Sequence, residues 1–277
     1  MPELPEVETV VRCLRPLLEG RQIKTGKVLC PSMLWKNPAV FLRKIRRQVI
    51  TDLQRKGKYI LCHLSSGDLL VIHLGMSGRL YCAEHQTPLA KHTHLILFLA
   101  DSTQELRFED PRRFGKVLLL GARDKSTCPQ LESLGPDPLQ ISSQEFCQAL
   151  ASRKREIKAL LLDQHFLCGI GNIYSDEALF LSRLHPRQPA HRIPRPQAKR
   201  LHQAIRQVLT RAIRAGGSSI RDYVDGLRRP GQFQLQYNVY GRTGEPCRKE
   251  DCCAAILRIT AGGRSAHFCP RCQVLSR

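Results

Sequence analysis

The chain begins with Met1, Pro2 and Glu3, whose N-terminal amine and carboxyl side chain could carry out covalent chemistry. Removal of Met1 would leave Pro2 as the N-terminus, with a free secondary amine. An α-amino group titrates near ~8, well below the ~10.4 of lysine, so a usable neutral fraction exists at pH 7. Such an amine can form a Schiff base at a carbon of the aldehyde oxidation level, and the Glu3 carboxyl can transfer a proton. The alternative is that Pro2 and Glu3 only begin a helix, where proline and acidic residues are favoured.

A cysteine cluster near the C-terminus is a second group with chemical potential. Five of the 12 cysteines lie at the end of the chain, spaced Cys247-x4-Cys252-x16-Cys269-x2-Cys272, with Cys253 next to the second. Two close pairs on a hairpin-length spacer are typical of a metal site and not of a disulfide framework. Four thiolates suit structural Zn²⁺, and a closed site leaves no open position for catalysis. Cys253 remains an alternative to Cys252 as the ligand.

The charge of the chain indicates a polyanionic partner. The formal net charge is +20, and residues 151–237 contain 16 basic against 6 acidic residues. A field of this size favours nucleic acid. No apolar run approaches the ~18 residues of a membrane span, and the N-terminus does not resemble a secretory signal. We therefore expect a soluble, intracellular protein with no membrane partner.

Hydrophobic patterns predict a β-rich first half and a helical second half. Apolar residues at helical spacing over 7–18, followed by Gly20, predict a helix that anchors the N-terminus. Short apolar runs between 22 and 120, separated by turn residues, predict a β-sandwich. Helical spacing begins at about 145, so the expected fold class is α+β. The expected parts are a catalytic β-sandwich domain, a linker, a helical DNA-binding domain and a zinc finger, over residues 1–134, 135–150, 151–237 and 238–277.

A glycine-rich turn, Gly169-Ile-Gly-Asn172, precedes one of the predicted helices. Backbone amides at the start of a helix suit a phosphate group. On the residues alone, a plain turn between two helices explains the motif equally well. The Pro/Arg-rich stretch over 186–197 predicts a surface loop.

Six short motifs extend over almost the whole chain. They are Met1-Pro-Glu-Leu-Pro-Glu-Val-Glu8, Arg55-Lys-Gly-Lys-Tyr59, His73-Leu-Gly-Met-Ser-Gly78, Asp110-Pro-Arg-Arg-Phe-Gly115, Gly169-Ile-Gly-Asn-Ile-Tyr174 and Val239-Tyr-Gly-Arg242. With the cysteine finger, they resemble the signatures of the formamidopyrimidine-DNA glycosylase (Fpg) family, which has endonuclease VIII (Nei) as a relative. The resemblance implies a β-sandwich with an N-terminal helix, a helix–two-turn–helix domain and a β-hairpin zinc finger, with DNA in the cleft between.

The resemblance implies roles for residues at the catalytic centre. Pro2 would be the Schiff-base nucleophile and Glu3 the proton donor. Glu6 would support the N-terminus, and Lys58 would serve at the catalytic centre. A lysine cation near the amine disfavours protonation of Pro2, which agrees with this assignment. Without the family context, Lys58 would be one more cation on a β-turn.

The resemblance also implies how DNA is held. A damaged base inside a duplex must be flipped out, and a wedge must fill the gap. By resemblance the wedge is Met76, Arg112 and Phe114, with Arg113 as an alternative probe. Arginine only donates hydrogen bonds, which suits the O2 and N3 acceptors of an orphaned cytosine. Five positions match phosphate contacts of the family: His92, Lys158, Asn172, Tyr240 and Arg264.

The activity implied by the resemblance is a bifunctional DNA glycosylase and AP lyase of base excision repair. It would excise oxidised purines such as 8-oxoguanine and formamidopyrimidines, and cleave the strand by β,δ-elimination. The wedge and the segment 216–231, which resembles a loop that caps a flipped 8-oxoguanine, favour the Fpg branch. The alternatives are a Nei-type enzyme for oxidised pyrimidines and a zinc-ribbon DNA-binding protein without chemistry.

Several further expectations follow from the resemblance. The partner is double-stranded DNA with oxidised bases or abasic sites, and the only cofactor is one structural Zn²⁺. We expect a monomer that works with the DNA in a bacterial-type cytoplasm. The first cysteine pair departs from the usual family spacing by two inserted residues. This departure leaves the choice of ligand open, but not the presence of a metal.

Overall fold

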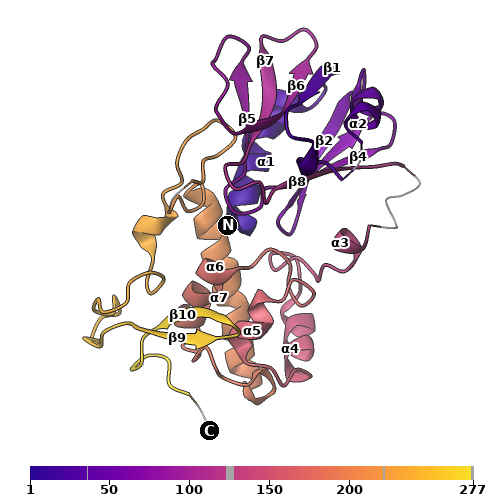
Figure 1. Cartoon of the computed structure of the whole chain (residues 1–277). Coiled ribbons are helices and arrows are strands. Elements are labelled where there is room, and N and C mark those ends of the chain that lie inside the picture. Colours follow the sequence, from indigo (N-terminus) through magenta and orange to yellow (C-terminus); the bar gives the residue numbers. More distant parts are fainter. Residues whose placement is uncertain (36, 123–127, 221, 276–277) are drawn as a thin grey trace. The chain divides into compact units, whose positions relative to one another are not determined.

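The computed structural model describes residues 1–35, 37–122, 128–220 and 222–275. The chain forms two compact units, each with helices and antiparallel strands (Figure 1). One unit consists of Met1–Glu132 and Ala215–Gln232, and the other of Ser133–Arg214 and Phe233–Arg277. Within the described residues, no helix combines the length and apolar character needed to cross a bilayer.

The N-terminal unit contains the expected β-sandwich. Its two four-stranded sheets have the strand orders β1-β6-β7-β5 and β2-β3-β4-β8. Ile60 and Ile72 of one sheet are fully buried in a core that also contains Leu97 and Phe108 of the other. The strands are β1 (Ile23–Val28), β2 (Ile50–Lys56), β3 (Tyr59–Leu64), β4 (Leu69–His73), β5 (Arg79–Glu84), β6 (Thr93–Leu99), β7 (Gln104–Glu109) and β8 (Lys116–Leu120). Both sheets thus bury one face in a common core, as a sandwich requires.

Helix α1 (Leu4–Leu18) is fixed against this core along its whole length. Val7, Leu14 and Leu18 are fully buried and recur at the spacing of one helical face. Gly20 follows the helix at a φ of +78°, in the left-handed region that glycine adopts readily. The smaller elements of this unit are a 3₁₀ turn (Pro31–Met33), α2 (Pro38–Ile45) and α3 (Pro129–Glu132). Because α1 is held along its length, the residues that precede it are held as well.

The C-terminal unit is built around α6 (Asn172–Leu181). The long helix α7 (Arg195–Arg214) and strand β10 (Arg264–Phe268) both pack on α6, and α4 (Ser143–Ala151) packs on α7. The other elements are α5 (Ile157–Leu162), β9 (Leu257–Ala261) and 3₁₀ turns at Ala190–Arg192 and Phe233–Gln236. Strands β9 and β10 form an antiparallel hairpin. The α+β class, with a sandwich followed by helices and a C-terminal hairpin, is confirmed.

Two expected boundaries differ from the contacts in the structure. The stretch 135–150, expected to be a linker, contains most of α4, because Phe146 and Leu150 are buried. The segment 215–232, expected in the helical domain, groups with the N-terminal unit. Its Tyr223 is buried in the core that α1 shares with the sheets. The remaining domain boundaries stay a prediction.

Candidate active site and nucleic-acid interface

The start of α1 holds the N-terminal residues in one position. Glu3 is buried and its backbone N–H donates to Glu6 Oε2 at 2.8 Å. Glu3 and Glu6 form a capping box, which satisfies backbone donors at the helix start. The other oxygen, Glu6 Oε1, accepts from the Ser218 N–H at 2.7 Å, 212 residues away in the chain. One carboxylate therefore fixes both the N-terminus and a distant loop.

The segment 215–232 has further contacts that hold it in the N-terminal unit. The Tyr223 hydroxyl donates to the Glu6 carbonyl oxygen at 3.2 Å. Burial, together with the charge of Glu6, raises the pKa of Tyr223 well above its usual value, so the hydroxyl remains a neutral donor. The buried Asp225 carboxylate accepts from the Arg229 backbone N–H at 2.8 Å and from its Nε at 2.9 Å. This is the loop that the family resemblance places over a flipped base.

Lys58 lies in the tight turn between β2 and β3, where its side chain is buried. The turn is held against α1 by an ion pair in which Arg55 Nε lies 2.8 Å from Glu8 Oε2. Burial, together with the charge of Lys58, lowers the pKa of His73 to about 4. The imidazole is therefore neutral at pH 7. The structure places Lys58 beside His73, on a turn fastened to the second turn of α1.

Two loops of the N-terminal unit expose large side chains. Met76 is 42% exposed and Phe114 is 52% exposed, which is unusual for large apolar residues. The Arg112 guanidinium lies over the Phe114 ring, 4.9 Å from its centroid. Arg113 is also exposed and has a φ of +56°. The wedge expected from the sequence is therefore on the surface of this unit.

Asp110 fastens these two loops together. Its fully buried carboxylate accepts from the Gly115 N–H at 2.7 Å and from the Arg112 N–H at 3.2 Å. It also accepts from the Ser77 hydroxyl at 2.5 Å. The loops meet closely, since a Cβ on Gly75 would lie 2.5 Å from the Gly115 nitrogen. One buried carboxylate thus fixes the two loops that expose Met76, Arg112 and Phe114.

In the C-terminal unit, buried ionic contacts and hydrogen bonds hold the start of α6 in position. Lys158 is fully buried, and its Nζ lies 2.5 Å from Asp176 Oδ1 and donates to the Asn172 carbonyl oxygen at 3.2 Å. Asp176 Oδ2 accepts from the His267 backbone N–H at 3.0 Å. Asn172 Nδ2 donates to Ser265 Oγ at 3.4 Å. This network joins α5, α6 and β10 around the glycine-rich turn.

The candidate phosphate contacts differ in their exposure. Arg264 is exposed at the start of β10, and Asn172 and Tyr240 are half-buried. His92, in the N-terminal unit, is half-buried as well. Lys158 differs from the others, because no part of its side chain reaches the surface. Its charge balances Asp176 and holds the helix start in place.

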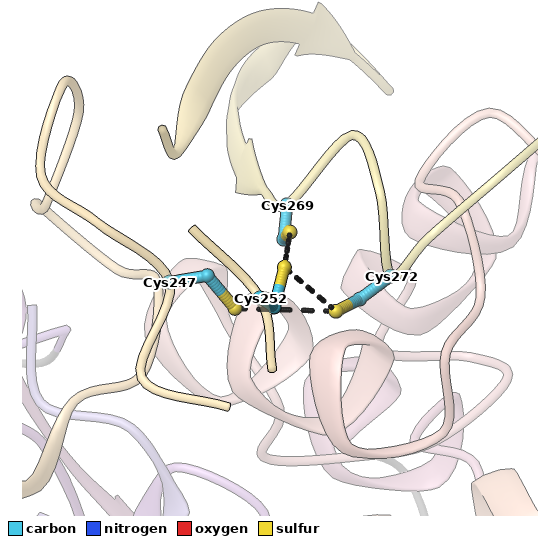
Figure 2. Close-up of side chains that lie close together, drawn as sticks. All are labelled: Cys247, Cys252, Cys269 and Cys272. Atoms are coloured by element: carbon cyan, nitrogen blue, oxygen red, sulfur yellow. Dashed lines mark hydrogen bonds between the residues drawn. The ribbon is translucent and has the colours of Figure 1, made fainter. Parts of the chain in front are cut away.

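Four cysteine sulfur atoms meet at the base of the β9–β10 hairpin (Figure 2). The Sγ atoms of Cys247, Cys252, Cys269 and Cys272 lie within 4.8 Å of one another. Cys252 lies 3.6 Å from both Cys269 and Cys272, and Cys247 lies 3.9 Å from Cys272. Sulfur ligands about 2.3 Å from a tetrahedral zinc ion are about 3.8 Å apart, so the cluster is compatible with one zinc. Cys253 is exposed and outside this cluster.

Comparison with known proteins identifies the family of the chain. Residues 1–117 match the formamidopyrimidine-DNA glycosylase N-terminal domain, and residues 134–224 match the formamidopyrimidine-DNA glycosylase H2TH domain. Formamidopyrimidine-DNA glycosylases of Heliobacterium modesticaldum and Chloroflexus aurantiacus are each 46% identical over 99% of this chain, and over 100% and 98% of their own lengths. The chain belongs to the formamidopyrimidine-DNA glycosylase family.

Solved structures of the family share the fold of this chain. A Lactococcus lactis FPG variant in complex with Fapy-dG-containing DNA is 34% identical, with 99% of this chain and 100% of that chain covered and a TM-score of 0.90. MutM in complex with carbocyclic 8-oxo-G-containing DNA is also 34% identical, with the same coverage and a TM-score of 0.89. The family assignment from the six motifs is confirmed.

The structure gives supporting roles to residues for which the family resemblance implied none. Asp110 holds the wedge loops, and Asp176 holds Lys158. Glu177 accepts from the backbone N–H groups of residues 238, 239 and 240, at 3.0, 2.9 and 3.0 Å. A signal was available, because Asp176 and Glu177 are adjacent acids in the otherwise largely apolar stretch 172–181 of a strongly basic chain.

Asp110→Asn is expected to destabilise the N-terminal unit. The asparagine side chain replaces one of the two acceptor oxygens with an NH2 donor. At least one N–H or O–H group that now donates to the Asp110 carboxylate would then face another donor. We expect a decrease of about 1–3 kcal/mol in the free energy of unfolding, measured by urea denaturation. The exposed Asp101→Asn should change it by less than about 0.5 kcal/mol. Equal effects of the two substitutions would contradict a fastening role for Asp110.

Proposed function

We propose that the chain is a bifunctional DNA glycosylase and AP lyase that excises oxidised purines from double-stranded DNA. The observation that carries the proposal is the buried start of α1, where Glu6 holds Pro2 and Glu3, in a chain of this family. Family structures contain DNA with Fapy-dG, with an abasic site and with a carbocyclic 8-oxo-G. The protein acts as a monomer in base excision repair, in the bacterial-type cytoplasm that holds the DNA.

Pro2 supplies the nucleophile once Met1 has been removed. Its neutral nitrogen attacks C1′ of the damaged nucleotide, and the base leaves with the electron pair of the broken bond and takes up a proton. Glu3 donates a proton to the ring oxygen of the sugar as the ring opens, which forms the iminium. Loss of the C2′ proton expels the 3′ phosphate, and a second elimination expels the 5′ phosphate. The cation of Lys58 keeps the Pro2 amine in its neutral form.

The exposed wedge fills the space that the flipped nucleotide leaves. Met76 and Phe114 insert into the base stack, and Arg112 donates to the O2 and N3 of the orphaned cytosine. Their exposure supports this assignment, since a folded chain gains nothing from apolar side chains in water. The Asp110 network keeps both loops rigid, so the wedge enters the duplex already ordered.

Phosphate groups are held by side chains of both units. We assign direct contacts to His92, Asn172, Tyr240 and Arg264. Asn172 is the first residue of α6, where backbone N–H groups and the helix dipole favour an anion. For Lys158 the burial against Asp176 supports a positioning role, in which it orients the start of α6 toward the phosphate.

One structural Zn²⁺ is held by Cys247, Cys252, Cys269 and Cys272. The ion contributes folding free energy to the hairpin, and it takes no part in base removal. Four thiolates complete its coordination, so no position is open for water or substrate.

Two other functions remain to be separated from this one by experiment. Excision from duplexes with 8-oxoguanine, formamidopyrimidine or thymine glycol distinguishes a purine-directed enzyme from a Nei-type enzyme. The segment 215–232, ordered by Glu6 and Asp225, supports the purine-directed one. Borohydride reduction on abasic DNA distinguishes an enzyme from a DNA-binding protein, because only a Schiff base is trapped.

Glu3→Gln should separate base excision from strand cleavage. The variant loses the acid but keeps the Pro2 amine, so excision of 8-oxoguanine should fall by ~10²-fold or more. Cleavage at preformed abasic sites should remain measurable, because those sites already carry an aldehyde. Retention of Met1 should abolish the borohydride-trapped adduct in otherwise unchanged protein. Normal excision by Glu3→Gln, or an adduct from protein that keeps Met1, would refute the assignment.

Arg112→Ala should weaken the preference for a lesion opposite cytosine over one opposite adenine. A base-reading arginine contributes about 1–3 kcal/mol of discrimination, so the ratio of excision rates should fall by about fivefold or more. The matched control is Arg113→Ala, which removes the neighbouring exposed guanidinium. Loss of the preference in the control alone would show that Arg113 reads the orphaned base.

Cys252→Ser should release zinc, whereas Cys253→Ser should bind it normally. The first substitution removes a sulfur from the four-atom cluster, and the second changes an exposed residue outside it. Metal analysis of the purified variants gives the zinc content, and an anisotropy titration gives the affinity for DNA. The opposite pattern would show that the ligand is Cys253.

A further inference from the structure

Helix α7 presents an exposed face whose charged groups are all cationic. Its 20 residues contain no aspartate or glutamate, and six basic side chains are exposed on it. They are Arg195, Lys199, Arg200, Arg206, Arg211 and Arg214, here called the basic face. No carboxylate of the described residues lies within 4.0 Å of these six groups. The Arg206 guanidinium donates to the Leu139 carbonyl oxygen at 2.6 Å.

The stability of the helix does not account for this composition. The opposite face, with Leu201, Ile205 and Leu209 buried, already holds α7 against α4 and α6. Arg195 and Lys199 are like charges at i,i+4, a spacing that costs a few tenths of a kcal/mol. Cations at the start of a helix also oppose its dipole. Only Arg211 and Arg214, in the last turn, interact favourably with the dipole, by about 0.3–1 kcal/mol each. Helix stability therefore does not account for all six cations on one side of α7, whereas an anionic partner does.

The basic face is separate from the phosphate contacts proposed for this unit. Asn172 and Arg264 lie on α6 and on β10, and β10 packs on α6. Helix α7 packs on α6 through its apolar side, so its basic face points away from α6. Within the described residues, α7 has no comparable packing with β9 or β10. A duplex held by Asn172 and Arg264 therefore leaves the basic face available.

The chemistry of this face fits the backbone of duplex DNA better than it fits a protein. Arg195 and Arg214 are about 28 Å apart along the axis, at 1.5 Å per residue. This length matches about eight base pairs, with phosphates on each strand every 3.4 Å. The other exposed side chains between them are Pro196, Gln203, Gln207 and Thr210, with no aromatic or large aliphatic anchor. Protein interfaces depend on such anchors, whereas phosphate contacts do not.

We propose that the basic face of α7 binds the sugar–phosphate backbone of a second, undamaged duplex while the first duplex occupies the lesion site. The proposal rests on the proposed function for the identity of the first ligand. A second duplex in contact with the enzyme gives it a route from a repaired site to neighbouring DNA. Binding of this kind is independent of base sequence and depends strongly on salt.

The test uses full-length, zinc-loaded protein trapped by borohydride on a short abasic hairpin. Fluorescence anisotropy then measures binding of a labelled, undamaged 30-base-pair duplex over a range of salt concentrations. The test variant carries Arg195→Gln, Lys199→Gln, Arg200→Gln and Arg211→Gln. The control variant loses the same charge from exposed positions of the N-terminal unit, by Lys24→Gln, Arg43→Gln, Lys44→Gln and Arg46→Gln.

We expect the trapped wild-type and control proteins to bind the second duplex with affinities within about twofold. The test variant should bind it at least tenfold more weakly, with a log–log salt slope smaller by up to about 4, at ~0.9 per lost phosphate contact. Single-turnover excision from a short lesion duplex should be unchanged in the test variant. Its thermal unfolding temperature should stay close to that of the wild type, because removal of the repulsion between Arg195 and Lys199 offsets the lost dipole interaction of Arg211.

Four outcomes would overturn the proposal. They are no second duplex on the trapped wild type, equal losses in both variants, a matching loss of single-turnover excision, and tighter binding of polyglutamate than of DNA. The last would identify an acidic protein as the partner. If no trapped adduct forms, the proposed function fails by itself. The two variants are then compared as free proteins, where equal salt slopes would overturn the role of the basic face.

Discussion

The buried carboxylate of Glu6 is the constraint on which the candidate active site depends. A carboxylate removed from water must accept hydrogen bonds, because burial of an unpaired charge is costly. Glu6 meets this requirement with the Glu3 and Ser218 backbone N–H groups, one on each oxygen. The N-terminal residues and the loop at 218 are therefore located by the same requirement. Movement of either one would break a hydrogen bond to this buried carboxylate.

Buried acids organise the other functional surfaces in the same way. Asp110 collects the N–H groups of the wedge loops, and Glu177 collects those of residues 238–240. Asp176 joins Lys158 to the hairpin. The chain has 24 acidic residues against 44 basic ones. The acids buried in these networks are not available to surface cations, and no carboxylate of the described residues forms an ion pair with the basic face of α7.

The hairpin depends on its four cysteines and on buried acids of α6 together. Its hydrophobic cluster is small, and three of its buried members are Cys247, Cys252 and Cys269. A segment of this size buries too little apolar surface to be stable alone. Phe180 of α6 completes the cluster, and the neighbouring Glu177 binds the backbone at 238–240. The hairpin is thus ordered by α6 and by its own cysteines, so the position of Arg264 on β10 depends on both.

The sequence by itself determined the features that arise from local periodicity and spacing. The apolar stripe of 7–18 predicted α1, short apolar runs separated by turn residues predicted the sandwich, and the cysteine spacing predicted the four-sulfur cluster. The motif Asp110-Pro-Arg-Arg-Phe-Gly115 placed Arg112 and Phe114 on one loop, where both are exposed. These features were predictable because the residues that produce them are close neighbours along the chain.

Only the tertiary structure decided which distant groups satisfy one another. It placed 215–232 with the N-terminal unit, because the Ser218 N–H donates to Glu6 and the Tyr223 side chain is buried in the sandwich core. It buried Lys158, expected to face phosphate, because Asp176 lies opposite its ammonium group. It also brought Cys252, and not Cys253, next to Cys269. Long-range pairing depends on how the elements pack. A local sequence pattern therefore does not determine which distant residue contacts a buried charge or thiol.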